Sequence, residues 1–123
     1  MLFTASVSDL KRIKKKMKNY YLIRNQGDDV VIPDKLDLDY YKSGVLTWEG
    51  FKLNYSEKLM RNDAMDWMRL VSEEAVSDDV VLIDEENDAE HSYRKFLAER
   101  MINMFSGHLK LQYIGELINL YVK

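Results

Sequence analysis

The stretch SEKLMRNDAMDWMRLVSEEAV, residues 56–76, predicts the helix around which the core of this chain is built. Its apolar side chains recur every three or four residues, which places them on one face of a helix. They are Met60, Ala64, Trp67, Met68, Val71 and Ala75. Large side chains each contribute about 1.5–3 kcal/mol when they leave water, so this face anchors a small core. The helix begins at Ser56 or, if Asn62-Asp63 interrupts it, near Asp63.

The composition is that of one globular domain spanning residues 1–123. Hydrophobic residues make up 46% and charged residues 32% of the chain, which excludes a disordered protein and allows a single core. The absence of cysteine excludes disulfides, thiolate zinc sites and thiol nucleophiles. There is no signal-peptide pattern and no apolar run of the roughly 18 residues that a membrane span needs. We therefore expect a cytoplasmic protein.

Two further helices are predicted from apolar spacing and capping residues. Ser8 is a candidate N-cap for a helix that runs to Tyr21. Asn87 followed by Glu90 is close to a capping box and opens a helix that ends at Gly107. The apolar face of the second helix contains Ala89, Tyr93, Phe96, Leu97, Met101, Met104 and Phe105.

Four segments favour β structure. Residues 30–32 are a short β-prone run, and residues 36–41 alternate weakly, as an edge strand does. Residues 45–55 form a hairpin about Glu49-Gly50, or one strand kinked at Gly50. Residues 80–83 are a continuous apolar run that predicts a buried strand. The polar residues 25–29 predict a turn after the first helix.

The last segment, residues 109–122, fits two patterns. On a helical wheel its polar residues gather in one narrow sector, whereas as a hairpin about Gly115-Glu116 it has one apolar face. We favour the helix, because a single glycine costs a helix only about 1 kcal/mol. The elements together predict an α+β domain, with three to four helices packed on one face of a small, mainly antiparallel sheet.

Charge is distributed unevenly along the chain. Residues 1–24 contain seven basic residues and one acid, a net charge of +6, although the whole chain carries −3. Between Leu70 and Tyr93 there are nine acids and no lysine or arginine. Such segregation steers charged partners toward opposite parts of a molecule.

The residues exclude several familiar chemistries. There is no nucleophile elbow, phosphate-binding loop or dinucleotide fingerprint. The two histidines are His91 and His108, and His91 follows a carboxylate-rich loop in which Asp84, Glu85 or Asp88 could hold Mg²⁺. The plainer interpretation is a solvated loop leading into a helix N-terminus, where the dipole favours acids. We therefore expect no enzymatic activity, no metal and no cofactor.

Two binding functions remain. The first is a protein-binding inhibitor, such as an immunity protein, an antitoxin or a phage anti-defence protein, whose acidic surface meets a basic partner. Its candidate residues are Asp78, Asp79, Asp84, Glu85, Glu86, Asp88 and Glu90.

The second is a small nucleic-acid-binding regulator that uses a basic helix, with Tyr20 and Tyr21 near it for stacking on bases. Its candidate residues are Lys11, Arg12, Lys14, Lys15, Lys16 and Lys18.

Aromatic residues outside the predicted helical faces are candidates for an interface. Tyr40, Tyr41 and Tyr55 meet this condition, and tyrosine is enriched in protein interfaces.

Overall fold

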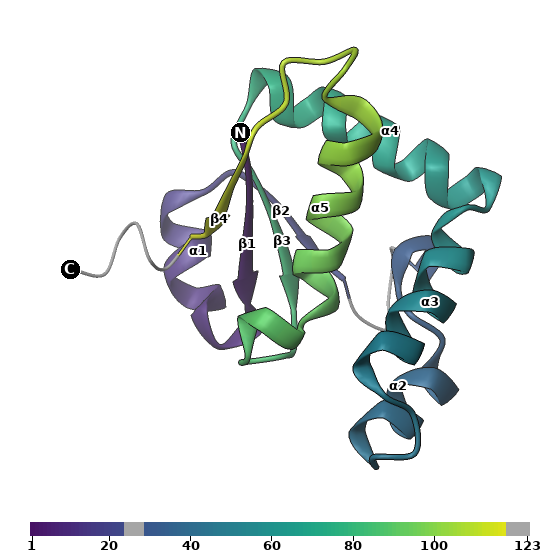
Figure 1. The fold of residues 1–123 in the computed structure, drawn as a ribbon. Coiled ribbons are helices and arrows are strands. Elements are labelled where there is room, and N and C mark those ends of the chain that lie inside the picture. Colours follow the sequence, from purple (N-terminus) through teal and green to yellow (C-terminus); the bar gives the residue numbers. More distant parts are fainter. Residues whose placement is uncertain (24–28, 118–123) are drawn as a thin grey trace.

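A computed structural model of the chain describes residues 1–23 and 29–117. Four strands form one sheet in the order β2-β3-β1-β4, and every neighbouring pair is parallel. Helices lie on both faces of this sheet (Figure 1). The strands are β1 (Leu2–Ser6), β2 (Asn19–Leu22), β3 (Val80–Asp84) and β4 (Tyr113–Glu116).

The two central strands form the middle of the core. All residues of β1 and β3 are buried, as expected of parallel strands that helices cover on both sides. The strand predicted at residues 80–83 is therefore confirmed. Alternate residues point to opposite faces, so that Leu82 packs in one hydrophobic cluster and Val81 and Ile83 in the other.

The helices occupy the two faces unequally. They are α1 (Leu10–Lys16), α2 (Lys35–Lys42), α3 (Trp48–Leu59), α4 (Asn62–Ser77) and α5 (Tyr93–Phe105), with short 3₁₀ turns at Val7–Asp9, Asp29–Val31 and Ala89–His91. Ile13 and Met17, from α1 and the residue after it, pack on one face of the sheet, whereas α4 and α5 cover the other face. Helices α2 and α3 pack against each other and project beyond the sheet (Figure 1).

The path of the chain explains this arrangement. From β1 the chain passes through α1 to β2, and then returns through α2, α3 and α4 to β3, between β2 and β1. It finally crosses through α5 to β4, on the other side of β1. Because crossovers between parallel strands are right-handed, a reversal of direction moves the later helices to the opposite face of the sheet.

The prediction of three to four helices on one face of a mainly antiparallel sheet is wrong, since the described residues form five α-helices on both faces of a parallel sheet. Residues 36–41 lie in α2, residues 48–55 in α3, and residues 30 and 31 in a 3₁₀ turn. Thr47 caps α3, since its Oγ1 accepts a hydrogen bond of 3.0 Å from the amide of Gly50. Phe51 and Tyr55 then lie four residues apart on the buried face of that helix. The apolar spacing read as a hairpin is therefore the face of a helix.

Two of the predicted helices have different bounds in the structure. The helix predicted from Ser8 to Tyr21 ends at Lys16, because Met17 is extended and the next residues enter β2. The helix predicted from Ser56 is interrupted after Leu59, and α4 begins at Asn62, which confirms the later of the two predicted starts. Four of its six predicted core residues are buried, whereas Met60 is 65% exposed and Trp67 is half-buried.

The helix predicted after Asn87 is present but begins later. A 3₁₀ turn comes first, and Ser92 caps α5 by accepting a hydrogen bond from the amide of Lys95. Tyr93, Leu97 and Met101 are buried on its inner face, as predicted.

Residues 113–116 are strand β4, so neither the helix nor the hairpin predicted there is correct. Residues 118–122 of that prediction, and most of the turn predicted at residues 25–29, lie outside the described residues. No helix within the described ranges is long and apolar enough to cross a membrane.

Candidate functional site

The candidate site lies where β1 and β3 end. Ser6 and Asp84, the last residues of these strands, are neighbours in the sheet. The chain leaves β1 toward α1 on one face and leaves β3 toward α5 on the other. In open parallel sheets, ligands bind outside the carboxyl ends of the strands at such a switch point. The side chains at this edge are therefore the first candidates for a functional site.

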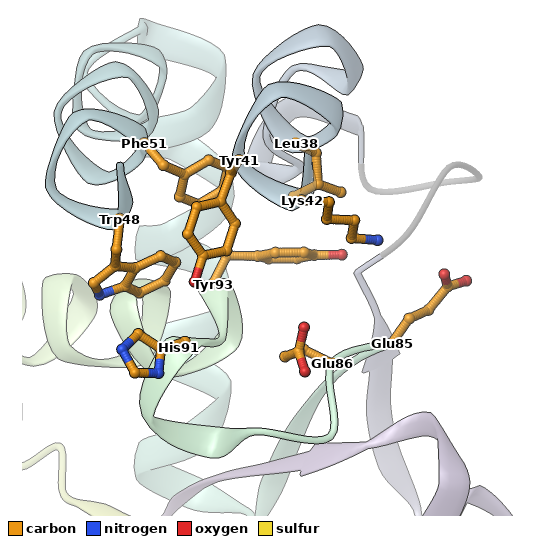
Figure 2. Close-up of a pocket in the computed structure, with 9 residues that line it drawn as sticks. All are labelled: Leu38, Tyr41, Lys42, Trp48, Phe51, Glu85, Glu86, His91 and Tyr93. Carbon is orange, nitrogen blue, oxygen red and sulfur yellow. The ribbon is translucent and has the colours of Figure 1, made fainter. Parts of the chain in front are cut away.

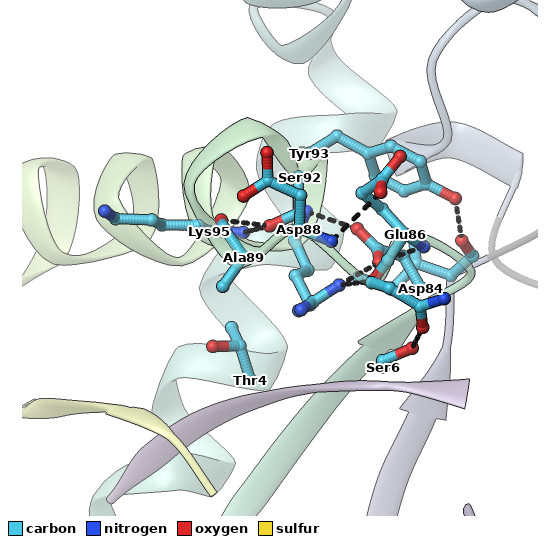
Figure 3. A network of polar contacts seen from close by, with 12 residues as sticks. Thr4, Ser6, Asp84, Glu86, Asp88, Ala89, Ser92, Tyr93 and Lys95 are labelled. Carbon is cyan, nitrogen blue, oxygen red and sulfur yellow. Dashed lines mark hydrogen bonds and ion pairs between the residues drawn. The ribbon is translucent and has the colours of Figure 1, made fainter. Parts of the chain in front are cut away.

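A buried ionic cluster fills the inner part of this edge. Arg94 on α5 is fully buried and donates from Nη1 to Asp84, and from Nη2 and Nε to the two carboxylate oxygens of Glu116, at 2.6 and 3.1 Å. The backbone amide of Arg94 also donates to Asp84, at 2.9 Å. Figure 3 shows Asp84, at the end of β3, within this network of polar contacts. Buried charges require such partners, because an unpaired charge in the interior is costly.

A bulge in β4 brings Glu116 into the cluster. Leu2 pairs with Tyr113 but the next residue of β1 pairs with Gly115, so Ile114 is an extra residue in β4. Without it, Tyr113 and Glu116 would face opposite sides of the sheet. With it, both side chains contact the hydroxyl of Thr4, which donates to Glu116 and lies 2.7 Å from the Tyr113 hydroxyl.

Two factors set the pKa values in this cluster: burial, and the sharing of the Arg94 guanidinium between two carboxylates. Burial raises the pKa of Asp84 above its ordinary value, although the charge and hydrogen bonds of Arg94 oppose the rise. The guanidinium is shared with Glu116, so Asp84 receives less than a full counter-charge. Burial alone would lower the pKa of Arg94, but its hydrogen bonds and two negative neighbours outweigh this and raise it. Arg94 is therefore always protonated.

The segment after β3 is held in shape by its own carboxylates. Asp84, Glu86 and Asp88 each accept a hydrogen bond from the backbone amide two residues further along, at 3.0, 3.0 and 3.1 Å. This arrangement imitates a backbone turn. Three acids of the predicted surface therefore also serve to fix the loop.

Two longer-range hydrogen bonds hold the same segment to the sheet. Arg94 donates from Nη1 to the carbonyl oxygen of Glu86. Ser6 Oγ donates to Asn87 Oδ1 at 2.9 Å, which joins the end of β1 to the loop after β3 (Figure 3). The loop is thus tied to the fold at its beginning and in its middle.

The outer side of the loop carries exposed ion pairs. His91 Nδ1 lies 2.8 Å from a carboxylate oxygen of Asp88, and Lys95 donates to Glu90 at 2.8 Å. The hydrogen bond from His91 lowers the pKa of Asp88, and the hydrogen bond to Glu90 raises the pKa of Lys95. Exposed pairs of this kind contribute little to stability, because water and salt screen them.

A small pocket lies beside the loop, beneath α2 and α3. Figure 2 shows aromatic rings on one side of it and the carboxylates of Glu85 and Glu86 on the other. Trp48 stacks on Phe51, with ring centroids 5.4 Å apart, and meets His91 edge-on at 5.5 Å. The pocket has a volume of about 50 Å³. Its lining is Leu38, Tyr41, Lys42, Trp48, Phe51, Glu85, Glu86, His91 and Tyr93.

A second hollow, of about 540 Å³, lies between α5 and residues 111–114. It is wide and open, and Glu99 is the charged side chain in its lining. Binding sites usually enclose most of the surface of a ligand, which this open hollow does not. The pocket beside the loop is therefore the better candidate.

The loop gathers some of the predicted acidic residues. Glu85, Asp88 and Glu90 are exposed there, and Glu86 is half-buried beside them. Asp84 is only 1% exposed and is engaged with Arg94, so it belongs to the interior.

The remaining two predicted acids lie elsewhere. Asp78 and Asp79 are exposed but precede β3, whereas the loop follows it. A strand of five residues rises about 3.3 Å per residue, which separates the two groups by about 16 Å. The structure therefore divides the acidic surface into two.

The predicted basic residues lie together on the other side of the sheet. Lys11, Arg12, Lys14, Lys15, Lys16 and Lys18 are all exposed, on α1 or next to it. Tyr20 and Tyr21 belong to β2 instead of this helix. The hydroxyl of Tyr21 donates to Glu74 at 2.6 Å and its ring contacts Trp67, so Tyr21 already has partners within the fold.

The structure also shows the surroundings of the candidate metal ligands and of the candidate interface tyrosines. Among the described residues, no three His, Asp or Glu side chains are placed to hold a metal ion, and both oxygens of Asp84 are engaged by Arg94. Tyr40 is exposed and Tyr41 lines the pocket, but Tyr55 is buried and donates to the carbonyl of Val31.

Sequence reasoning named Asp84 but missed the other residues of the buried cluster. Arg94 lies among the buried positions of α5, with Leu97, Ala98 and Met101. A charged residue on the apolar face of a helix signals a buried ion pair, and this signal was present in the sequence. Nothing in the sequence pointed to Thr4 or Glu116 as its neighbours.

Comparisons with known proteins add no further information on the site. No model of a protein family matches the sequence, and neither does any curated protein or solved structure.

Proposed function

We propose that this chain is a protein-binding module that contacts a basic partner through residues 85–90, here termed the acidic loop. The observation that supports the proposal is that the loop is exposed and yet tied to the fold by Arg94, Ser6 and its own carboxylates. A preorganised loop loses little conformational entropy when a partner binds. Carboxylates held in fixed positions can then match cations on the partner.

The charge of the loop suggests the kind of partner. Acidic surfaces associate quickly with basic ones, in a manner that salt weakens. A basic groove that otherwise holds nucleic acid is one such surface. A small acidic protein that blocks it would act as an inhibitor, like an immunity protein, an antitoxin or a phage anti-defence protein. A cytoplasmic location is part of this proposal.

Charge reversal in the loop tests the proposal. The tagged chain and its Glu85→Lys/Glu90→Lys variant are used to capture partners from a lysate of the native host, at low and high salt. Asp78→Lys/Asp79→Lys is the matched control, since it changes the net charge equally at the other end of β3. We expect the loop variant to lose the captured protein and the control to keep it. Capture that survives in the loop variant would contradict the proposal.

A second candidate is a nucleic-acid-binding regulator that uses α1. The observation that favours it is the exposure of all six basic side chains on or next to this helix. Contacts of lysine and arginine with phosphates would make such binding strongly salt-dependent. It predicts that Lys14→Glu/Lys15→Glu abolishes binding to DNA or RNA in a gel-shift experiment, while the loop variant binds normally.

A further inference from the structure

We propose that the pocket beside the acidic loop receives one arginine side chain of the partner. The inference rests on the proposed function, because it names the group that the partner would present at this site. Charge complementarity alone does not say where on the loop a cation of the partner binds, and this pocket supplies one such position.

The size of the pocket excludes a cofactor or a metabolite as its ligand. Sites for cofactors and metabolites enclose about 300–1,000 Å³, whereas this pocket has about 50 Å³. The space is sufficient for the end of one side chain. Because it opens beside the acidic loop, a residue of a docked protein can reach it (Figure 2).

The lining suits a guest that is apolar along its length and cationic at its end. Tyr41, Trp48 and Phe51 lie on one side of the pocket, and the carboxylates of Glu85 and Glu86 lie on the other (Figure 2). Arginine buries its methylene stem along apolar surface while its charged head keeps polar partners. This two-sided lining therefore fits a long basic side chain better than an anion or a wholly apolar one.

Arginine fits this lining better than lysine. Its planar guanidinium offers five donors and pairs with carboxylates through two parallel hydrogen bonds, whereas an ammonium is a compact, strongly hydrated point charge. Arginine is also among the residues that most often carry binding energy at interfaces, usually from within a pocket surrounded by less important contacts.

Lys42 lies in the same pocket and allows the sign of the guest's charge to be tested. It is the fixed cation of the lining, at the end of α2. Like charges a few ångströms apart repel each other, so removal of Lys42 favours a cationic guest. For an anionic guest the same substitution removes an attraction. The direction of one change in affinity therefore identifies the charge of the guest.

The experiment is an NMR titration of the full chain with N-acetylarginine amide. The indole N–H signal of Trp48 reports on the pocket, and that of Trp67, on α4 beside Tyr21, serves as an internal control. N-acetylcitrulline amide is the neutral analogue of the same shape. Nα-acetyllysine amide, whose side-chain amine is free, is the ammonium analogue. Inorganic phosphate is the anionic probe.

We expect the arginine derivative to shift the Trp48 signal to saturation and to leave Trp67 unchanged. The citrulline derivative and phosphate should have no effect, and the lysine derivative should bind more weakly. Equal effects of arginine and citrulline would overturn the proposal, as would a shift caused by phosphate. Equal binding of the lysine derivative would overturn the choice of a guanidinium.

Two variants sharpen the result. Lys42→Ala should tighten binding of the arginine derivative about threefold or more, and Lys14→Ala, which removes the same charge on α1, should change it little. Glu86→Gln should weaken binding by a similar factor, while its remaining carbonyl oxygen still accepts from the amide of Asp88. Weaker binding in Lys42→Ala would overturn the proposal.

The outcome can be separated from that of the proposed function. If Glu85→Lys/Glu90→Lys loses the partner but the arginine derivative leaves Trp48 unchanged, the function stands and the pocket proposal fails. If the derivative binds with the expected selectivity but the loop variant keeps its partner, the pocket is a guanidinium site, whereas the proposed function fails and the partner is not the source of that guanidinium.

Discussion

Two sets of ion pairs lie side by side at the carboxyl ends of the strands, and they differ mainly in exposure. The inner pairs join Arg94 to Asp84 and Glu116, whose side chains are 1%, 0% and 15% exposed. The outer pairs join Asp88 to His91 and Glu90 to Lys95, whose side chains are 33–75% exposed. The residue types are similar, but only the inner pairs are cut off from water.

The difference shows which charges serve the fold and which remain for a partner. A charge that is buried must keep its partner, since the cost of leaving it unpaired is several kcal/mol. An exposed pair is worth little and can exchange its partner at little cost. The inner pairs therefore hold the sheet and the loop in place, and the outer pairs are free to rearrange on binding.

Removal of the central cation should have the largest effect. Arg94→Met leaves two carboxylates in the interior without a counter-charge, so we expect the free energy of unfolding to fall by about 3–5 kcal/mol. The measurement is urea denaturation. The control is Arg69→Met on α4, which breaks half-exposed pairs and should cost at most about 1 kcal/mol. Equal losses in the two variants would remove the distinction between buried and exposed pairs.

The bulge in β4 should have an intermediate effect. Gly115 has a φ of 115°, a conformation that residues with a side chain rarely adopt. We expect Gly115→Ala to cost about 1–3 kcal/mol, because the strain either remains or moves Glu116 away from Arg94. Gly107→Ala is the control, since space around it is open and its φ is ordinary. A Gly115→Ala variant as stable as the parent chain would show that the bulge does not hold Glu116 in place.

Asp84 and Asp88 should each make the stability of the fold depend slightly on pH, with opposite signs. The pKa of Asp84 is raised by burial, so its contribution to stability is present below its ordinary pKa and is lost as the pH rises through the folded-state pKa. The pKa of Asp88 is lowered by the hydrogen bond from His91, so its contribution is present above the ordinary pKa and is lost as the pH falls through the folded-state pKa.

The pKa values are measured from the carboxyl carbon signals of the two residues in an NMR titration. Asp84 should titrate above the ordinary value for aspartate and Asp88 below it. In a His91→Ala variant the value for Asp88 should return toward normal while that for Asp84 stays raised. A lowered pKa for Asp84 would mean that Arg94 outweighs burial and that the two sets of pairs behave alike.

Some elements could be predicted from the sequence because one pattern alone fitted them. Residues 80–83 are apolar without interruption, and the buried face of α4 has four apolar residues at helical spacing. By contrast, residues 36–41 and 48–55 fit strand alternation and helical spacing equally in short windows. The cap formed by Thr47 settles the second case, but only the folded chain shows that it is made.

Strands β1 and β4 and the site were harder to predict, for a related reason. Strand β1 contains Thr4 and Ser6, whose hydroxyls are satisfied by partners more than eighty residues away. Strand β4 has only four described residues, one of them a glycine at positive φ. The charges of the loop were visible in the sequence, but which of them turn inward depends on Arg94 and the parallel sheet.

The most direct test compares the two charged regions against the captured partner in titration calorimetry. Glu85→Lys/Glu90→Lys reverses two charges in the acidic loop, and Lys14→Glu/Lys15→Glu reverses two on α1. The account predicts at least about a tenfold loss of affinity in the first, with the free energy of unfolding unchanged within about 0.5 kcal/mol. It predicts equal or tighter binding in the second, because the chain becomes more acidic. Unchanged binding in the first variant, or lost binding in the second, would contradict it.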